Sequence, residues 1–302
     1  MKKTCQLITI ICLLSGGIFS ANAQMSTYYA THHNYRAVPV AEGLIQPWAM
    51  AWLPNGDMLI TEKPGRLRIV RDGQLLANEV PGVPGVVYEG QGGLFDVLPH
   101  PDFADNQLLY LSFAKPTADD GSTTAIVRGR LNNDRLTDVE EIFAANSVGR
   151  GHYGGRMAFD EDGYLFLSIG DRQAPPEGDL ESHPAQDTSN HHGAMVRLND
   201  DGSIPSDNPF IGERGVEPAI WSYGHRSPQG LAFHPETGDL WETEHGPQGG
   251  DELNLIVAGN NYGWPVIGYG VNYGPGIPIH ESSVEAGMEQ PTHFWVPSIA
   301  AS

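Results

Sequence analysis

The sequence predicts an all-β fold made of repeated sheet units, and three observations lead to this prediction. Thirty-seven glycines and 23 prolines among 302 residues imply many turns. The 3.6-residue hydrophobic period of an amphipathic helix is absent after residue 23. Four segments share one template, in which an apolar run, a turn and a second apolar run follow one another. Repeated β units of this length are typical of β-propeller blades, with a β-sandwich as the alternative.

Each repeat predicts a pair of strands. The first reads MAWLPNGDMLITE over 50–62, and the second reads LFDVLPHPDFADNQLLYLSF over 94–113. The third reads MAFDEDGYLFLSIGD over 157–171, and the fourth reads LAFHPETGDLWETEHG over 231–246. In each we expect two strands joined by a tight Asn-Gly, Asp-Gly or Gly-Asp turn. The uneven spacing of the repeats indicates loops of different length between them.

Residues 1–23 have the features of a cleavable secretory signal peptide. Lys2 and Lys3 form a positive start, a short apolar run follows, and Ala-Asn-Ala ends it, which predicts cleavage after Ala23. This run is shorter than the ~20 apolar residues of a membrane-spanning helix, and no later stretch reaches that length. We therefore expect a periplasmic or secreted protein without a membrane span, with the propeller over 24–302. Both cysteines lie in the signal peptide, so no disulfide is expected beyond it.

Acidic residues outnumber basic ones, which disfavours two classes of partner. The chain has 17 Lys and Arg against 37 Asp and Glu, a formal net charge of −20. Loss of the signal peptide removes two lysines and no acids, so the formal charge becomes −22. A charge of this sign disfavours nucleic acid and anionic membranes as partners. It is compatible with calcium sites, whose ligands are oxygens.

The stretch GRGHYGG at 149–155 matches the dinucleotide fingerprint G-x-G-x-x-G. That fingerprint has physical meaning only when a helix follows, because the helix N-terminus holds the pyrophosphate. The residues that follow here predict a hairpin, so the nucleotide interpretation is rejected. We expect the glycines to clear space around His152 for a flat ligand.

Three polar residues stand at an equivalent place, just before the first strand of successive repeats. Gln91 lies in GQGG, His152 in GHYGGR and Arg226 in GHRSPQG. In a propeller the innermost strand of each blade starts near the central channel, so these side chains are expected to gather at one end of it. A lone histidine or arginine is more often structural, and it is the equivalent placement that favours a shared site.

Five motifs occur in order from about residue 40 to the end of the sequence. They read GQGGLFDVLPHPDF, GHYGGRMAFDEDGYLFLSIGDR, VRLNDDGSIPSDNPF, WSYGHRSPQGLAF and EHGPQGGDELNLIVAGNNYGWP. Together they resemble the soluble quinoprotein sugar dehydrogenases, the PQQ-dependent aldose sugar and glucose/sorbosone dehydrogenases. The resemblance implies a six-bladed β-propeller, PQQ as cofactor and an aldose substrate oxidised at its anomeric carbon to a lactone. It also implies an electron acceptor, which the sequence does not identify.

The same resemblance implies roles for five residues. His152 would be the general base that takes the proton of the anomeric hydroxyl while hydride passes to the quinone, a task that suits the ordinary histidine pKa of ~6.5. Asp171 would orient the imidazole and stabilise its charge, and Arg226 would stabilise negative charge on the quinone. Gln91 would bind cofactor and substrate, and Tyr273 would line the cofactor pocket.

Two calcium sites are implied as well. Gly246 and Pro247 would offer carbonyl oxygens to an ion that bridges the quinone. Glu252 and the carbonyl of Tyr262 would hold a structural ion. The glycine-rich loop EHGPQGGDELN allows carbonyls and carboxylates to converge, and such hard oxygen ligands suit Ca²⁺. A solvated acidic turn is the alternative for the second site.

The sequence departs from the family pattern at three places. Ser227 follows Arg226 where the family usually has Asn, and Ala194 stands where a lysine is common. The sequence stops at FWVPSIAAS, so we expect the last blade to be missing or incomplete. Two other functions stay open: a calcium-dependent, lactonase-like hydrolase with His152 as base toward water, and a secreted carbohydrate-binding propeller.

Overall fold

The computed structural model describes residues 27–118, 120–274 and 276–302. The expected signal peptide lies outside these residues. The chain forms two compact units, Met1–Val40 and Ala41–Ser302. In the first unit, β1 (Thr27–Tyr28) and β2 (Tyr35–Arg36) pair as a short antiparallel ribbon.

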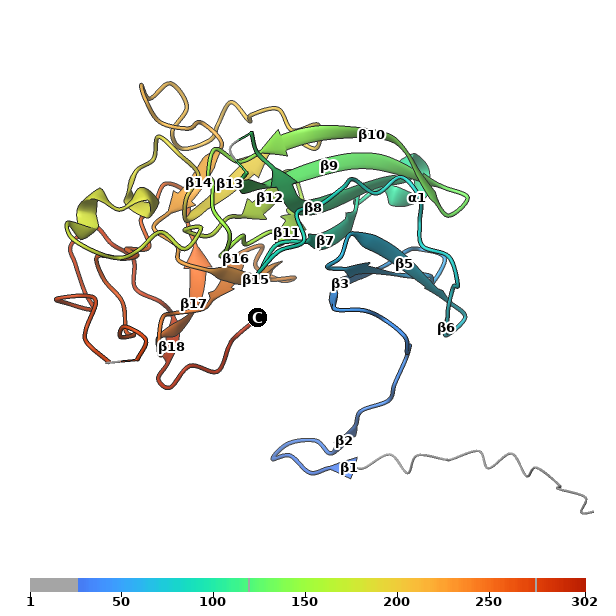
Figure 1. Ribbon diagram of the computed structural model, residues 1–302, viewed down its shortest axis with the longest axis horizontal. Coiled ribbons are helices and arrows are strands. Elements are labelled where there is room, and N and C mark those ends of the chain that lie inside the picture. Colours follow the sequence, from blue (N-terminus) through green and yellow to red (C-terminus); the bar gives the residue numbers. More distant parts are fainter. Residues whose placement is uncertain (1–26, 119, 275) are drawn as a thin grey trace, which may run out of the picture. The chain divides into compact units, whose positions relative to one another are not determined.

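Four antiparallel sheets of four strands each form the second unit, and each sheet takes its strands in chain order (Figure 1). Blade 1 comprises β3 (Pro47–Trp52), β4 (Met58–Glu62), β5 (Arg66–Arg71) and β6 (Gln74–Leu75). Blade 2 comprises β7 (Leu94–Pro99), β8 (Leu108–Pro116), β9 (Ser122–Asn132) and β10 (Arg135–Ala144). Blade 3 comprises β11 (Met157–Phe159), β12 (Leu165–Ser168), β13 (Ala194–Leu198) and β14 (Ile220–Tyr223). Blade 4 comprises β15 (Pro228–Phe233), β16 (Leu240–Glu244), β17 (Asp251–Ile256) and β18 (His293–Trp295).

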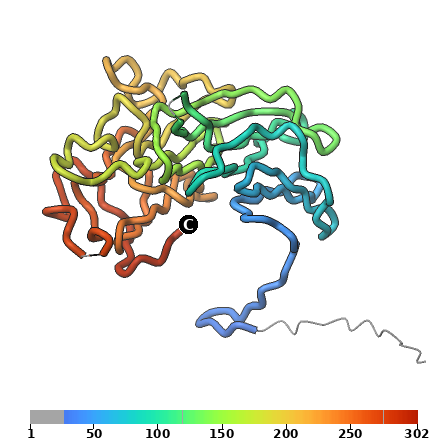
Figure 2. Tube along the Cα trace, in the orientation of Figure 1, coloured from blue at the N-terminus to red at the C-terminus, as the bar shows by residue number. Residues whose placement is uncertain are grey.

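The first strands of successive blades contact one another. Strand β3 contacts β7, β7 contacts β11, and β11 contacts β15. The chain passes from blade to blade in sequence order, which Figure 2 shows as a change from blue through green to orange. Four-stranded sheets that meet along their innermost strands are the arrangement of a β-propeller. The prediction of an all-β propeller is therefore confirmed for four blades, whereas the expected total of six stays a prediction.

The four sequence repeats correspond to the first two strands of the four blades. A tight turn joins these strands in blades 1, 3 and 4, as expected. In blade 2 the prediction of a tight turn is wrong, because the helical turn α1 (Phe103–Asn106) connects β7 to β8. Phe103 is buried in the core between blades 1 and 2, and Gln107 ends the turn with a left-handed φ of 58°. The helical turn lets an apolar side chain of the connection cover the core.

Apolar side chains fill the space between neighbouring blades. Leu59 of blade 1 packs in one cluster with Leu111 of blade 2, and Ile126 of blade 2 packs in another with Leu167 of blade 3. A third cluster joins blades 3 and 4. Strands β12 and β13 are buried at every position because a neighbouring blade covers each face. Strand β4 is also buried throughout, because blade 2 covers one face and Ala41 and Leu44 pack on the other. This is why their sequences read as continuous apolar runs with little alternation.

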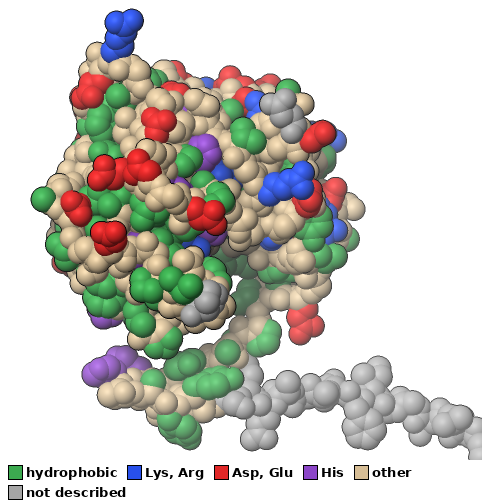
Figure 3. Space-filling view, turned by 60° about the vertical axis from the view of Figure 1, so that its left-hand side comes forward, with side chains coloured by type: hydrophobic (Ala, Val, Ile, Leu, Met, Phe, Trp, Pro, Cys, Tyr) green, Lys and Arg blue, Asp and Glu red, His purple; other side chains and the backbone are tan. Residues whose placement is uncertain are grey.

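The surface is rich in acidic groups, as the net charge implies. Figure 3 shows Asp and Glu side chains spread over one face of the molecule. Within the residues that the structure describes, no helix is both long and apolar enough to cross a membrane. Two short 3-10 helices, Leu180–Ser182 and Pro184–Gln186, lie in the long connection between β12 and β13.

Candidate active site

A buried histidine–aspartate pair lies at the centre of the candidate site. Nδ1 of His152 lies 2.6 Å from Oδ1 of Asp171, and these side chains are 12% and 2% exposed. The second carboxylate oxygen of Asp171 accepts a hydrogen bond from Nε1 of Trp264 at 2.8 Å. Oδ1 also accepts from the backbone N–H of Gln173 at 2.8 Å. Both oxygens are thus engaged, which fixes the carboxylate and leaves Nε2 of the imidazole for proton exchange with a ligand.

The loop that carries His152 is held by contacts on both sides. His152 has a left-handed φ of 40°, and its backbone N–H donates to Oε1 of Gln91 at 2.7 Å. The Arg172 guanidinium lies 3.7 Å from the centre of the Tyr153 ring and donates to the Gly149 carbonyl at 2.6 Å. Such a cation–π contact, combined with a charge-assisted hydrogen bond, resists movement of the loop. The imidazole is therefore presented from a rigid support.

The glycines of this loop have a different role from the one expected. A Cβ atom at Gly149, Gly151 or Gly154 would lie only 2.2–2.5 Å from atoms of residues 168–173. The glycines thus allow the loop to pack against the segment that carries Asp171. The expectation that they clear space for a flat ligand is wrong at these three positions, because their Cβ directions point into protein.

Arg226 lies just before β15, and its side chain is held by the next loop. Nη1 donates to the carbonyl oxygens of His245 and Gly246 at 2.7 and 2.6 Å. Its guanidinium carbon lies 5.2 Å from the centre of the Trp264 ring. Nε is buried and has no hydrogen-bond partner within the described residues. Nη2 makes no hydrogen bond within the described residues either, so it is the donor of this fixed cation that remains for an acceptor on a bound ligand.

Two adjoining clefts open beside the histidine–aspartate pair. Their volumes are about 370 and 390 Å³, within the range of small-ligand sites. Both clefts are lined by Gln91, His152, Arg226 and Tyr273, and Asp171 lines the first. The structure therefore brings together all five residues that the sequence analysis placed at the cofactor and substrate.

The four residues expected to bind calcium line one small cavity. Gly246, Pro247, Glu252 and Tyr262 lie around it, and its volume of about 20 Å³ has room for about one water-sized particle. Pro247 also lines the first cleft, so cavity and cleft are neighbours. Burial, together with the nearby Glu244 carboxylate, raises the pKa of Glu252 to about 8. This crowding of negative charge fits a cation, although the structure shows one cavity where two sites were expected.

Two site residues were missed in the sequence analysis. Trp264 holds Asp171, and it stands in the motif NNYGWP, of which only Tyr262 was assigned a role. Glu244 is the last residue of β16, and its Oε2 accepts from the backbone N–H groups of Arg226 and Ser227 at 2.5 and 3.1 Å. Its position at the end of a strand, beside the glycine-rich loop, was the available signal.

Fold and site together define a class of protein. It is a β-propeller in which the starts of the innermost strands converge on a buried histidine–aspartate pair and an arginine beside clefts of small-ligand size. Residues 44–302 match the Glucose / Sorbosone dehydrogenase family, and the chain belongs to this family.

Two of the named relatives with at least 35% identity are sugar dehydrogenases. Aldose sugar dehydrogenase YliI of Escherichia coli is 42% identical over 98% of this chain and 76% of its own length. The crystal structure of the soluble aldose sugar dehydrogenase from Escherichia coli in the apo-form is 44% identical with a TM-score of 0.78, covering 84% of this chain and 73% of that chain. The PQQ-bound form of the aldose sugar dehydrogenase from Streptomyces coelicolor is 31% identical with a TM-score of 0.70, covering 85% and 70%. The family likeness thus supports an oxidoreductase.

Proposed function

We propose that the protein is a PQQ-dependent dehydrogenase that oxidises the anomeric carbon of aldose sugars to lactones. One observation carries this proposal: Gln91, His152 and Arg226 converge on clefts beside the buried Asp171. It gains support from the PQQ-bound sugar dehydrogenase among the relatives. An unidentified acceptor would reoxidise the cofactor after each turnover.

The residues around the clefts fit a flat, anionic quinone. Nη2 of Arg226, which makes no hydrogen bond within the described residues, can donate to a carbonyl or carboxylate oxygen. Trp264 and Tyr273 offer aromatic faces, and the Tyr273 side chain is free to adjust because the residue is 66% exposed. When bound, PQQ (pyrroloquinoline quinone) supplies a two-electron acceptor for the hydride of the sugar's anomeric carbon.

His152 accepts the proton of the anomeric hydroxyl at Nε2. The Asp171 carboxylate lies 2.6 Å from Nδ1, which keeps the proton on Nδ1 and the lone pair on Nε2. When the second proton arrives, the same carboxylate stabilises the positive imidazolium. Trp264 prevents the carboxylate from turning away, because its indole N–H holds Oδ2. Proton abstraction by a base held in this way contributes ~10²–10⁴ in rate.

Arg226 and Gln91 supply the charge and the hydrogen bonds around the reacting groups. The Arg226 guanidinium is fixed by two backbone carbonyls before any ligand binds, so it stabilises developing negative charge without reorganising. Oε1 of Gln91 is occupied by the backbone of His152, which leaves the amide nitrogen of Gln91 to donate to substrate or cofactor.

We further propose that the small cavity beside the cleft binds Ca²⁺. The Glu252 carboxylate and the Tyr262 carbonyl would be ligands of a structural ion in this cavity, and the carbonyls of Gly246 and Pro247 would face a second ion outside it, next to the cofactor. The cavity volume, the oxygen ligands and the crowded carboxylates support this assignment.

A titration of the purified protein with PQQ and Ca²⁺ tests the function. Aldose-dependent dye reduction that requires PQQ supports the dehydrogenase. Lactone hydrolysis without PQQ favours the hydrolase with His152 as base, and sugar binding without turnover favours the carbohydrate-binding propeller. The quinone absorbance reports binding separately from catalysis, so a protein that binds PQQ but does not turn over is recognised.

Two further expectations are kept as proposals. We infer a ring of six blades from the resemblance, and the four sheets are compatible with it because the chain covers 73% of the length of the Escherichia coli apo structure. Export is proposed from the composition of residues 1–23, and mass spectrometry of the N-terminus of the periplasmic or secreted protein tests cleavage after Ala23.

A further inference from the structure

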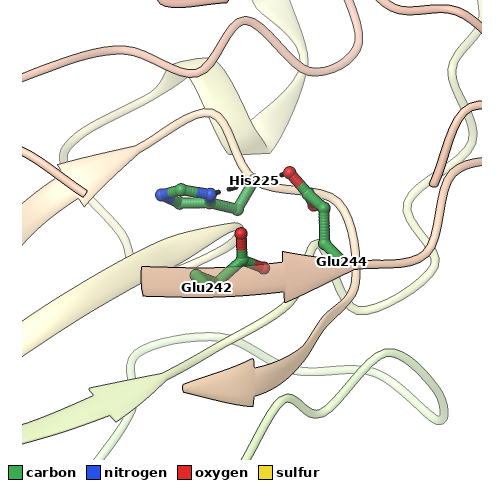
Figure 4. Close-up of side chains that lie close together, drawn as sticks. All are labelled: His225, Glu242 and Glu244. Atoms are coloured by element: carbon green, nitrogen blue, oxygen red, sulfur yellow. Dashed lines mark ion pairs between the residues drawn. The ribbon is translucent and has the colours of Figure 1, made fainter. Parts of the chain in front are cut away.

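Three titratable side chains converge inside blade 4, next to Arg226. His225 precedes β15, while Glu242 and Glu244 lie two residues apart on β16, so both carboxylates project from the same face of the strand. Figure 4 shows the two carboxylates on the side of β16 that faces the imidazole. One potential metal-binding atom from each residue lies within 4.8 Å of the other two. The three residues are 0%, 1% and 4% exposed, respectively.

Several polar atoms in this cluster are buried without a hydrogen-bond partner among the described residues. They are Nδ1 of His225, Oε1 of Glu242 and Oδ1 of the adjacent Asn254. Asn254 lies opposite Glu242 in the β16–β17 ladder, and its Nδ2 donates to Oε2 of Glu242 at 3.1 Å and to Oε1 of Glu244 at 3.3 Å. Buried acceptors without donors are costly, and a cation among them would offset that cost.

The imidazole of His225 is oriented as a metal ligand requires. Its Nε2 lies 2.9 Å from Oγ of Ser222, and a hydrogen bond from Nε2–H to this hydroxyl leaves a lone pair on Nδ1. Nδ1 lies 3.7 Å from Oε1 of Glu244, too far for a hydrogen bond. Two ligands of one ion at metal–ligand distances of roughly 2.1–2.4 Å lie roughly 3.0–3.9 Å apart, which includes this separation. The Tyr262 ring stacks on the imidazole at 4.5 Å and holds its plane.

The carboxyl groups of the cluster, those of Glu242 and Glu244, have no lysine or arginine partner among the described residues. Glu252 lies beside Glu244 in the β16–β17 register and adds a further carboxyl group. Buried carboxylates are ordinarily paired or coordinate metals.

We propose that His225, Glu242 and Glu244 form a buried site for a divalent transition ion such as Zn²⁺ or Mn²⁺. An imidazole with two carboxylates suits these ions better than Ca²⁺, which takes six to eight oxygen ligands. The site is separate from the cavity assigned to Ca²⁺, because neither His225 nor Glu242 lines that cavity. Glu244 contacts both.

An ion at this site would stabilise the segment that carries Arg226. Oε1 of Glu244 faces the imidazole, while its Oε2 accepts from the backbone N–H groups of Arg226 and Ser227. Fixing the Glu244 carboxylate therefore fixes the start of β15. The ion would affect only the position of this segment and would not contact the substrate.

Metal content and anomalous diffraction test the proposal. The full chain is freed of metal with a chelator, dialysed against Zn²⁺ or Mn²⁺, and measured by mass spectrometry of the metal and by diffraction at the metal's absorption edge. We expect an anomalous peak between the three side chains and at least tenfold weaker binding in Glu242→Gln. Glu252→Gln should keep this peak, which separates the site from the Ca²⁺ cavity. Glu217→Gln is the matched control. Oε2 of Glu217 lies 3.9 Å from Nε2 of His191, but this pair has no third potential metal ligand among the described residues, so the substitution should not change metal binding.

Thermal melting distinguishes a lost ligand from a damaged fold. Without metal, Glu242→Gln should melt at or above the wild-type midpoint, because the amide has the same shape and removes a buried acid. Added Zn²⁺ or Mn²⁺ should raise the wild-type midpoint and leave that of the variant unchanged. Equal metal content in both proteins, or a wild-type midpoint unaffected by these ions, would overturn the proposal. The three side chains of the cluster would in that case hold a shared proton and no metal ion. Ca²⁺ binding there in preference to both ions would overturn the proposed ion class.

Discussion

Single residues in the active site depend on partners from several blades. His152 leads into blade 3, yet its backbone is held by Gln91 before blade 2, and its carboxylate partner is held by Trp264 after β17. The proposed general base, supported from three blades, keeps its orientation only while those blades stay packed. Substitutions of single residues can therefore distinguish a residue that takes part in the reaction from one that only holds it in position.

Replacing His152 by Ala or Gln removes the proposed base. We expect turnover to fall by roughly 10²–10⁴ while quinone binding is largely retained, because the loss affects proton transfer. Steady-state dye reduction and a PQQ titration measure the two effects. His234→Asn, in the outer turn between β15 and β16, is the control and should keep activity. A near-normal kcat in the His152 variants would contradict the assignment.

Replacing Asp171 by Asn changes the proton arrangement of the imidazole without changing the size of its partner. The amide can turn an N–H toward Nδ1, which would move the ring proton to Nε2 and block proton abstraction. We expect kcat to fall by about 10²–10⁴, with the substrate KM changed much less. Kinetics across pH check this, and a variant with unchanged kcat would show that Asp171 only supports the fold.

Individual strands and loops place charged groups where burial changes their behaviour. Strand β17 presents Glu252 toward the small cavity, and the loop before β13 presents His191 toward the end of β10. In both cases the backbone around the group determines its environment. The stability of the protein is therefore expected to depend on Ca²⁺ through Glu252 and on pH through His191.

Glu252→Gln tests the proposed Ca²⁺ cavity. If Glu252 is a ligand, the variant loses the stabilisation that bound Ca²⁺ provides, about 2.7 kcal/mol at a hundredfold excess over Kd. We expect its thermal midpoint to drop far more in Ca²⁺ than in chelator. Glu140→Gln, at an exposed pair with Arg128, is the control. Equal shifts in both conditions would contradict the proposal that Glu252 binds Ca²⁺.

The buried imidazole of His191 is expected to make the folded protein less stable in mild acid. Its Nδ1 accepts from the backbone N–H of Asn146 at 2.8 Å, and burial lowers its pKa to about 4. The unfolded chain takes up this proton near pH 6.5, so falling pH between ~6.5 and ~4 favours unfolding, by up to roughly 3 kcal/mol. His191→Asn keeps an acceptor for Asn146 and should flatten this dependence. Denaturant unfolding between pH 7 and 4.5 measures it, and identical pH slopes would refute the prediction.

The whole molecule is held together by apolar clusters between blades. Leu167 is fully buried where blade 3 packs on blade 2. We expect Leu167→Ala to lower the free energy of unfolding by about 2–5 kcal/mol, because it removes buried surface and leaves a cavity. Leu255→Ala, at a side chain 38% exposed, should cost much less. Denaturant curves measure both, and equal costs would mean that packing between blades adds little to stability.

The sequence alone was enough for the repeats, the hairpins and the gathering of Gln91, His152 and Arg226. These features are local or follow from repetition: alternating apolar runs and turns form hairpins, and equivalent positions in repeated units meet around one axis. Tyr273 and Asp171 were predicted at the site only through the family resemblance, because neither follows from the repeat pattern.

Only the tertiary structure decided the contacts between distant segments. Trp264 reaches Asp171 across 93 residues, Phe103 enters a core shared by two blades, and the glycines at 149–154 pack on the chain that follows β12. The convergence of His225 with the carboxylates of β16 is of the same kind. Such contacts depend on how the blades and loops pack against one another. Close packing sets the separation of these atoms in space, and their separation along the chain carries no information about it.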